Sequence, residues 1–128
     1  MRLLLDTHAF LWWVTDDRQL SRKAKTAIAD ESNEILVSAA SAWEIATKHR
    51  IGRLDGVPGI GERFGELVAL DGFVHLSMSH RHASRAGSYE MDHRDPFDRM
   101  LAAQAELEGV PLVTKDTALK QFPCKLFW

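Results

Sequence analysis

The chain has 128 residues, of which 45% are hydrophobic and 27% are charged, and this composition suits an ordinary globular protein with one core. Its one cysteine, Cys124, excludes an intrachain disulfide and a cysteine-based zinc site, and it fits a reducing compartment. The formal net charge of −2 gives no general attraction to polyanions, so contact with nucleic acid would require local basic patches.

Short apolar runs alternate with helical patterns along the chain. The predicted strands are continuous apolar runs of the kind found in sheets covered on both faces: residues 2–5, 34–37, 73–76, 112–113 and 125–127. The predicted helices lie between them: residues 8–14, 21–31, 41–50, 60–69, 79–86 and 96–108. The last helix is the clearest, with Asp95 as a cap, Pro96 at its first position and Gly109 as its end.

This alternation predicts an α/β fold, in which helices cover both faces of a parallel sheet. Residues 52–61 contain several Gly and Pro residues and are expected to form a loop inside one domain that spans residues 1–128. The longest stretches without a formal charge, 7–15 and 35–43, are far shorter than the about 20 residues of a membrane-spanning helix. We therefore expect a cytoplasmic protein with no membrane association.

Acidic residues recur near the ends of the predicted strands and the starts of the following helices. Asp6 directly follows the first strand, and Glu44 is expected in the first turn of the helix after the second strand. Asp95 and Asp98 flank the start of helix 96–108, and Asp116 follows the fourth strand. Because ligands of open α/β sheets bind outside the carboxyl ends of the strands, we expect these acids to share one site.

Carboxylates that share a cleft repel one another, by about 1 kcal/mol per pair at 4 Å in water and about 4 kcal/mol at an effective dielectric constant of 20. Protonation or a bound cation relieves this repulsion. Oxygen ligands without cysteine favour Mg²⁺ or Mn²⁺ over zinc. Such an ion lowers the pKa of bound water and accepts phosphate oxygens, so the predicted reaction is metal-assisted phosphodiester hydrolysis.

Most of these acids also have a structural interpretation, in which they cap or begin a helix or turn. The candidates are Glu44 in a capping box with Ser41, Asp95 as the N-cap before Pro96, Asp98 in the first helical turn, and Asp116 before a turn at 117–120. Asp6 is the hardest to explain in this way, because an acid at the end of a buried strand has few structural reasons to be there.

Four segments of the chain resemble the PIN-domain ribonucleases, specifically the VapC-type toxins of bacterial toxin–antitoxin pairs. They are LLLDTH at 3–8, SAASAWEIATK at 38–48, HRDPFDRMLAAQA at 93–105 and LVTKD at 112–116. The resemblance covers essentially the whole chain, in order. It implies a three-layer α/β/α sandwich with a small, mostly parallel central sheet, an endoribonuclease that depends on Mg²⁺ or Mn²⁺, and a cognate antitoxin that inhibits it. By position, it assigns the acidic quartet to Asp6, Glu44, Asp98 and Asp116, with Asp95 as an additional acid and Thr114 as the supporting hydroxyl.

In this hypothesis Asp6, Glu44 and Asp98 hold the metal ion, and Asp116 completes the site or holds a second ion. In-line attack by an activated water would leave 5′-phosphate and 3′-hydroxyl ends and no 2′,3′-cyclic phosphate. Arg99 is expected to orient a carboxylate or to contact phosphate. His8 and His93 are expected beside the site or at the surface and not as ligands.

Two groups of basic residues are candidates for RNA contact, and each could equally be a solvated helix face. The first contains Lys48, Arg50 and Arg53, and the second contains His80, Arg81, His82 and Arg85. Lys48 could also pair with Glu44 at i,i+4 spacing.

The chain has four tryptophans, and two of them, Trp12 and Trp13, are consecutive, so one helix cannot bury both on a single stripe. Core packing is one interpretation of this apolar segment, and a homodimer face or a groove for an antitoxin segment is another.

Two alternatives to the nuclease hypothesis remain at this stage. One is a metal-dependent phosphatase or phosphotransferase with Asp6 as nucleophile, although that chemistry usually requires a second Asp two residues on, where this chain has His8. The other is a non-catalytic domain whose acids only bind metal and a partner.

Overall fold

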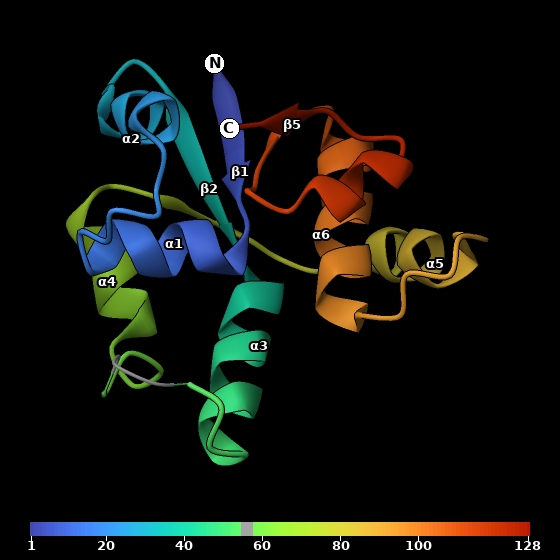
Figure 1. Ribbon diagram of the computed structural model, residues 1–128, viewed down its shortest axis with the longest axis horizontal. Helices are drawn as coiled ribbons and strands as arrows, with labels where there is room; N and C mark the ends of the chain where they lie inside the picture. Colours follow the sequence, from blue (N-terminus) through green and yellow to red (C-terminus); the bar gives the residue numbers. More distant parts are fainter. Residues whose placement is uncertain (55–57) are drawn as a thin grey trace.

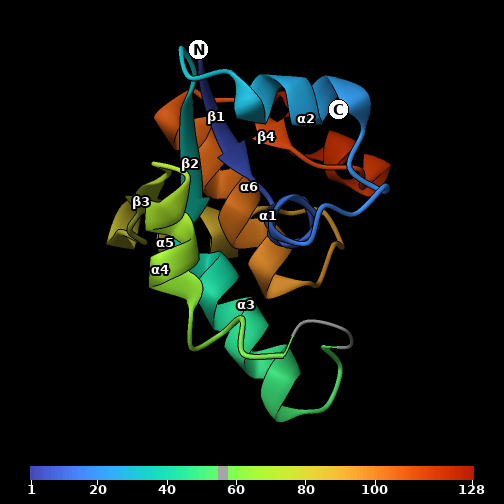
Figure 2. The same cartoon turned by 90° about the vertical axis from the view of Figure 1, so that its left-hand side faces the viewer.

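The computed structural model describes residues 1–54 and 58–128, and these residues form a parallel sheet with helices on both faces (Figures 1 and 2). The strands are β1 (Arg2–Leu5), β2 (Glu34–Ser38), β3 (Val74–Leu76), β4 (Leu112–Val113) and β5 (Leu126–Phe127). They pair in the order β3-β2-β1-β4-β5, and every pair is parallel. The predicted α/β class with a small parallel sheet is therefore confirmed.

The helices form one layer on each side of the sheet. Figure 1 shows α1 (Thr7–Val14), α2 (Arg22–Ala29) and α4 (Phe64–Leu70) to the left of the sheet. On the other side lie α5 (His80–Ser88), α6 (Pro96–Glu108) and the 3₁₀ helix η1 (Thr117–Gln121). Helix α3 (Ala39–Arg50) extends beyond the carboxyl ends of the strands.

The side chains of β1 alternate between two hydrophobic cores. Leu3 and Leu5 pack with residues of α1, α2 and α4, whereas Leu4 packs with residues of α5 and α6. All three leucines are fully buried, so β1 reads as a continuous apolar run, as expected for a central parallel strand. None of the helices in the described part of the chain is long and apolar enough to cross a membrane.

The strand register aligns the residues that leave the sheet at its carboxyl edge. Leu5 of β1 is level with Val37 of β2 and with Val113 of β4. The next residues along these three strands are Asp6, Ser38 and Thr114, which are all buried polar residues. The register therefore places Asp6 at the centre of this edge.

Helix α3 begins earlier than the sequence predicted. Its N-cap is Ser38, whose hydroxyl accepts a hydrogen bond from Ala40 N at 2.9 Å, so the helix starts at Ala39 and not at residue 41. Glu44 consequently lies in the second turn, and the expected capping box with Ser41 does not form. Helix α4 also begins later than predicted, because residues 60–63 form turns. Part of the expected loop at 52–61, residues 55–57, lies outside the described residues.

Candidate functional site

Asp6 joins β1 to α1 and caps that helix. Its Oδ1 accepts a hydrogen bond from Ala9 N at 2.7 Å, and only 7% of the residue is exposed. Burial is the largest effect on the pKa of Asp6, which is raised to about 6. Thr114, the backbone N–H of Ala9 and the charge of His8 act in the opposite direction and lower this pKa. The charge of Asp98 raises this pKa further. Asp6 thus has a helix-capping role and is also poised to gain or lose a proton.

Glu44 is buried on α3, with 3% of the residue exposed, and it forms an ion pair with Lys48 one helical turn further along. A hydrogen bond of 3.0 Å between the hydroxyls of Thr7 and Ser41 joins the start of α1 to the start of α3. This contact ties the helix that follows Asp6 to the helix that carries Glu44. The predicted i,i+4 pair of Glu44 and Lys48 is present.

Asp95 and Asp98 divide two roles at the start of α6. Asp95 is the N-cap, and its Oδ1 accepts hydrogen bonds from Phe97 N at 2.9 Å and from Asp98 N at 3.1 Å. The carboxylate of Asp98 instead contacts His93, with 2.9 Å between Oδ2 and Nε2. Burial raises the pKa of Asp98, the His93 contact lowers it, and the charges of Asp95 and Glu44 raise it again.

Thr114 and Asp116 lie at the end of β4. The Thr114 hydroxyl oxygen accepts a hydrogen bond from Asp116 N at 3.0 Å, and the Thr114 side chain lowers the pKa of Asp6. Asp116 is exposed and caps η1 through a hydrogen bond from Ala118 N of 2.9 Å. A pocket of about 240 Å³, here called the acid pocket, is lined by Asp6, His8, Trp12, Lys115 and Asp116.

The folding of the chain thus brings the predicted acids to one edge of the sheet. Asp98 interacts electrostatically with both Asp6 and Glu44, and Asp116 shares the acid pocket with Asp6. As they stand, no three His, Cys, Asp or Glu side chains among residues 1–54 and 58–128 are arranged to hold a metal ion. Two of the acids have other partners, since Glu44 is paired with Lys48 and Asp98 with His93. By type and by charge the acids fit a hard divalent cation, which would compete with these two partners.

Arg99 was expected from the sequence to orient a carboxylate or to contact phosphate. In the structure, Arg99 instead binds backbone carbonyls. Its guanidinium donates hydrogen bonds to backbone carbonyls in the last turn of α5 and in the segment between α5 and α6: those of Ala86 (2.8 Å), Gly87 (3.5 Å), Tyr89 (2.5 Å), Met91 (3.1 Å) and His93 (2.9 Å). A planar guanidinium with several fixed donors is suited to such a set of acceptors. Arg99 therefore fixes the segment that carries His93, and this role was invisible from residue spacing.

The two groups of basic residues differ in their distance from the acids. Lys48 and Arg53 line a pocket of about 320 Å³, here called the basic pocket, together with Thr7, His8, Leu11, Ile45 and Leu54. Arg50 is exposed near the end of α3, and Arg81 is exposed on α5. Arg85 forms an ion pair with Glu106 near the carboxyl end of α6, whereas Asp98 lies near its start. The structure thus separates Arg85 from the acids it was expected to accompany.

One buried polar contact was missed in the sequence, and a second, half-buried contact involves His93, which was expected beside the site or at the surface. Ser38 donates a hydrogen bond of 2.5 Å to Gln104 Oε1, which joins the end of β2 to α6. His93 contacts Asp98 and packs its ring edge-on against Phe122 at a centroid distance of 5.5 Å. The position of His93 two residues before Asp95 offered a signal, but its direction could not be read from the sequence.

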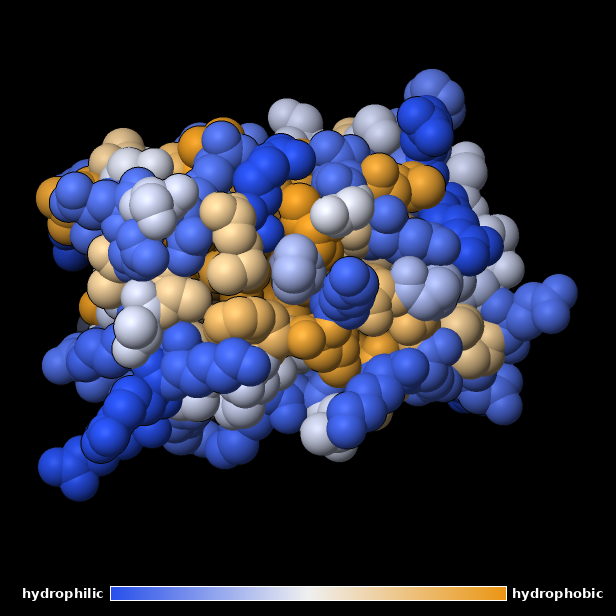
Figure 3. Space-filling model, turned by 90° about the horizontal axis from the view of Figure 1, so that it is seen from above, coloured by the Kyte–Doolittle hydropathy of each residue, from blue (hydrophilic) through white to orange (hydrophobic). Residues whose placement is uncertain are grey.

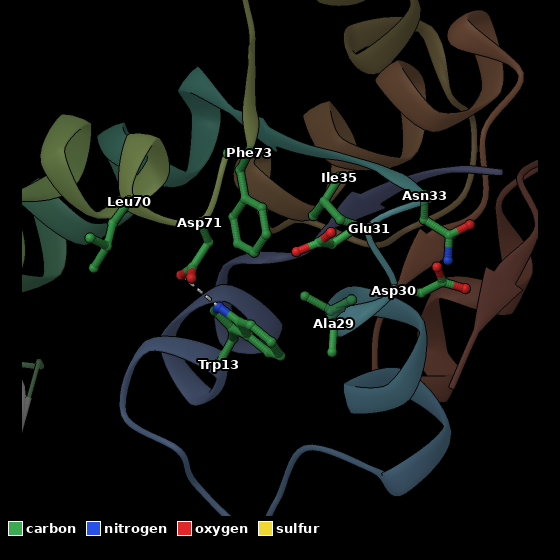
Figure 4. Close-up of a pocket in the computed structure, with 11 residues that line it drawn as sticks. Trp13, Ala29, Asp30, Glu31, Asn33, Ile35, Leu70, Asp71 and Phe73 are labelled. Carbon is green, nitrogen blue, oxygen red and sulfur yellow. Dashed lines mark hydrogen bonds between the residues drawn. The ribbon is translucent and has the colours of Figure 1, made fainter.

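A larger pocket of about 540 Å³ lies away from these acids (Figure 4). It lies between the carboxyl ends of α1, α2 and α4, and its lining includes Trp13, Ile35, Leu70, Asp71 and Phe73. Trp13 Nε1 donates a hydrogen bond of 3.0 Å to Asp71 across this pocket. Since the predicted acids do not line it, its size does not make it the candidate catalytic site.

Comparisons with known proteins identify a family and a relative for this chain. The model of the PIN domain family matches residues 3–123. Ribonuclease VapC22 of Mycobacterium tuberculosis (strain ATCC 25618 / H37Rv) is 31% identical over 121 residues, which cover 92% of this chain and 89% of that protein.

Two solved structures share the fold. One is a chain of the crystal structure of VapBC2 from Rickettsia felis bound to a fragment of its promoter DNA. It has a TM-score of 0.72 and 14% identity, and the match covers 100% of this chain and 99% of that one. The other is a chain of a toxin–antitoxin complex from Klebsiella pneumoniae, with a TM-score of 0.58, 21% identity, and coverage of 90% and 87%.

Proposed function

We propose that this chain, which belongs to the PIN-domain family, is a metal-dependent endoribonuclease toxin that a cognate antitoxin inhibits. The relative named Ribonuclease VapC22 supports the activity, since it aligns over 92% of this chain. The likeness to chains of VapBC2 and of a second toxin–antitoxin complex supports the antitoxin partner. The proposal treats residues 1–128 as one PIN-like domain that works in the cytoplasm, where its RNA substrate is.

The observation that carries the proposal is the gathering of buried and half-buried carboxylates from separate elements at the carboxyl edge of the sheet. Asp6 follows β1, Glu44 lies on α3 and Asp98 lies on α6. We assign metal binding and catalysis to these three residues and to Asp116, which shares the acid pocket. Repulsion among carboxylates favours binding of a cation, and this supports the assignment.

The proposed cofactor is Mg²⁺, with Mn²⁺ as an alternative, because the donors are carboxylate oxygens. When bound, such an ion activates water and stabilises the negative charge that develops on the phosphoryl and leaving oxygens. The ion would be held by Asp6, Glu44, Asp98 and Asp116.

The residues around the acids have supporting roles in this proposal. Thr114 orients the carboxylate of Asp6 through a hydrogen bond, and His93 does the same for Asp98. Asp95 fixes the start of α6 by capping it, so that the carboxylate of Asp98 remains available. Because the pKa of Asp6 is about 6, this carboxyl group is mainly ionised at pH 7 and becomes protonated in mild acid.

The aspartyl-phosphate alternative has less support. A nucleophilic carboxylate must reach a phosphorus atom, but Asp6 is 7% exposed and its Oδ1 is held by Ala9 N. We therefore assign Asp6 to metal binding and not to covalent catalysis.

We also propose that the chain forms a homodimer. Two large apolar residues at α3 are exposed: Trp43 on the helix and Ile51 just beyond its end. Each has 49% of its surface accessible. Light scattering on the purified chain tests this: a mass of two chains supports the proposal, and a mass of one chain contradicts it.

The test of the activity is induction of the chain alone in a bacterial host, with the ends of cellular RNA mapped. We expect growth arrest and new RNA ends with 5′-phosphate and 3′-hydroxyl groups for the wild type, and neither effect for Asp98→Asn. Equal effects of both proteins would contradict the assigned site. Ends with 2′,3′-cyclic phosphate would contradict hydrolysis by water, because they require the 2′-hydroxyl as nucleophile.

A further inference from the structure

The two consecutive tryptophans of α1 belong to different surfaces of the molecule. Trp13 lies against Asp71 and Phe73 and lines the larger pocket (Figure 4). Trp12 is half-buried and contacts the rings of His8, at a centroid distance of 5.5 Å, and Trp128, edge-on at 5.9 Å. Figure 3 shows one face of the molecule, on which apolar residues lie among hydrophilic ones. The accessible part of Trp12 lines the acid pocket.

The acid pocket combines an aromatic ring, a cation and the proposed catalytic acids. Trp12 and Lys115 line it together with Asp6 and Asp116, and the Lys115 ammonium lies 5.8 Å from the centroid of the Trp12 ring. Core packing would account for the buried part of Trp12, but it does not require a cation and two carboxylates around the remaining part. An exposed cation beside an aromatic ring is the combination used to bind single-stranded nucleic acid.

His8 connects this pocket to the basic pocket, since it lines both. The basic pocket contributes Lys48 and Arg53, and Lys48 is paired with Glu44. Two pockets that share His8 therefore adjoin the proposed site, one with Lys48 and Arg53 and the other with Trp12 and Lys115. This arrangement suits an extended chain of alternating phosphates and bases better than it suits a compact ligand.

We infer that Trp12 is a base-stacking platform in the substrate site, where one unpaired nucleobase next to the scissile phosphate packs against its ring. Lys115, Lys48 and Arg53 bind the flanking phosphates. Stacking tolerates every base, because each base has a π-face, so Trp12 adds affinity for an unpaired base without selecting a sequence. The inference rests on the proposed function and adds Trp12 to the residues that contact the substrate.

The test measures binding of two probes to variants built on Asp98→Asn, which prevents cleavage. One probe is a fluorescein-labelled single-stranded RNA of 12 nucleotides with random sequence, and the other is an abasic ribose-phosphate chain of the same length. We expect Trp12→Ala to weaken binding of the RNA by about 5- to 150-fold, the range of stacking contributions, and to leave binding of the abasic chain unchanged. Lys115→Ala is expected to weaken binding of both probes, because it removes a phosphate contact.

Trp13→Ala is the matched control, since it makes the same truncation on the same helix but at the other surface. It is expected to leave binding of both probes unchanged. A loss of RNA binding in Trp13→Ala equal to that in Trp12→Ala would overturn the inference, because general loosening of α1 would then explain both. Equal weakening of both probes by Trp12→Ala, or no weakening, would also overturn it.

A second measurement covers the case in which Trp12→Ala does not fold. Stacking on RNA is expected to quench tryptophan fluorescence in the wild-type sequence and in Trp13→Phe, but not in Trp12→Phe, which keeps an aromatic ring without its emission. Unchanged quenching in Trp12→Phe would contradict the platform. If Trp12→Phe or Trp12→Ala instead weakens only binding of the antitoxin, this surface belongs to the antitoxin and the inference is wrong. Failure of the wild type to bind or cleave RNA would contradict the proposed function itself.

Discussion

Helix α6 carries two carboxylates whose surroundings differ sharply, Asp98 near its start and Glu106 near its end. Glu106 accepts hydrogen bonds from Arg85 Nε at 2.7 Å and from the Tyr89 hydroxyl at 2.7 Å. The hydrogen bond from Arg85 is the main reason that the pKa of Glu106 lies below its usual value. Burial raises the pKa of Asp98, and the charges of Asp95 and Glu44 add to this effect.

Glu106 has a structural role, whereas Asp98 belongs to the proposed metal site. The charge of Glu106 is matched by a guanidinium that comes from the neighbouring helix α5, so this pair holds α5 against α6. The carboxylates at the other end of the helix include more negative charge than their protein partners neutralise, and such an excess favours either protonation or a cation. The following predictions test this distinction, beginning with the largest expected effect.

Removing the charge of Asp98 should abolish most of the activity, whereas removing that of Glu106 should not. We expect Asp98→Asn to lower the rate of RNA cleavage by about 10²- to 10³-fold, as is typical when one electrostatic group is removed from a catalytic site. Glu106→Gln is the matched control on the same helix and should cleave at a rate within about twofold of the wild type. Comparable losses in the two variants would erase the proposed distinction.

Arg99 on α6 holds the end of α5 and the segment between α5 and α6 through its hydrogen bonds to backbone carbonyls. We expect Arg99→Ala to lower the free energy of unfolding by about 3 kcal/mol, since several backbone carbonyls lose a charged donor. Urea unfolding measures this, with exposed Arg94→Ala as the control. Arg99→Lys should recover little stability, and full recovery would mean that a point charge, without the fork of donors, is enough.

The burial of Asp6 predicts a pH-dependent stability difference. The folded-state pKa of Asp6 is about 6 against an ordinary value of 3.8, so its protonated form stabilises the fold below pH 3.8, and this stabilisation is lost as the pH rises through about 6. In the absence of divalent metal, Asp6→Asn should therefore be more stable than the wild type at pH 8, by about 3 kcal/mol. The gain should shrink between about pH 6 and pH 4. A gain that is independent of pH in urea unfolding would show that burial of this charge is not its cause.

The smallest expected effect is at the compensated end of α6. Tyr89→Phe removes the hydroxyl that donates to Glu106, but the ion pair with Arg85 remains. We expect the free energy of unfolding to fall by about 1 kcal/mol, and the rate of RNA cleavage to stay the same. Thermal unfolding and cleavage of the same preparation check both points. A large loss of cleavage would show that this end of the helix is coupled to the acids.

Much of this fold could be predicted from the sequence, because parallel strands covered on both faces read as short apolar runs. The start of α3 was misplaced, because the sequence offers two serines that can cap a helix, Ser38 and Ser41. Only tertiary structure decides between them: Ser38 ends β2 and caps the helix, and the Ser41 hydroxyl bonds to Thr7. The strand order also depends on long-range pairing that no local pattern encodes.

The candidate acids were identifiable from their positions after strands and before helices, but their partners were not. Arg99 was expected beside a carboxylate because Asp98 precedes it, yet successive helical residues point in different directions, and Arg99 turns to the backbone carbonyls instead. The same geometry separates Trp12 from Trp13. Spacing along the chain therefore predicts which residues reach an edge of the sheet, and packing determines what each of them touches.

Thermal unfolding at pH 8 with and without millimolar MgCl₂ or MnCl₂ tests the central claim most directly, because only a site with excess negative charge should gain stability from the ion. We predict that the metal raises Tm for the wild type and for Glu106→Gln but not for Asp98→Asn. An equal rise in all three proteins, or no rise in the wild type, would contradict the claim that these carboxylates form a metal site.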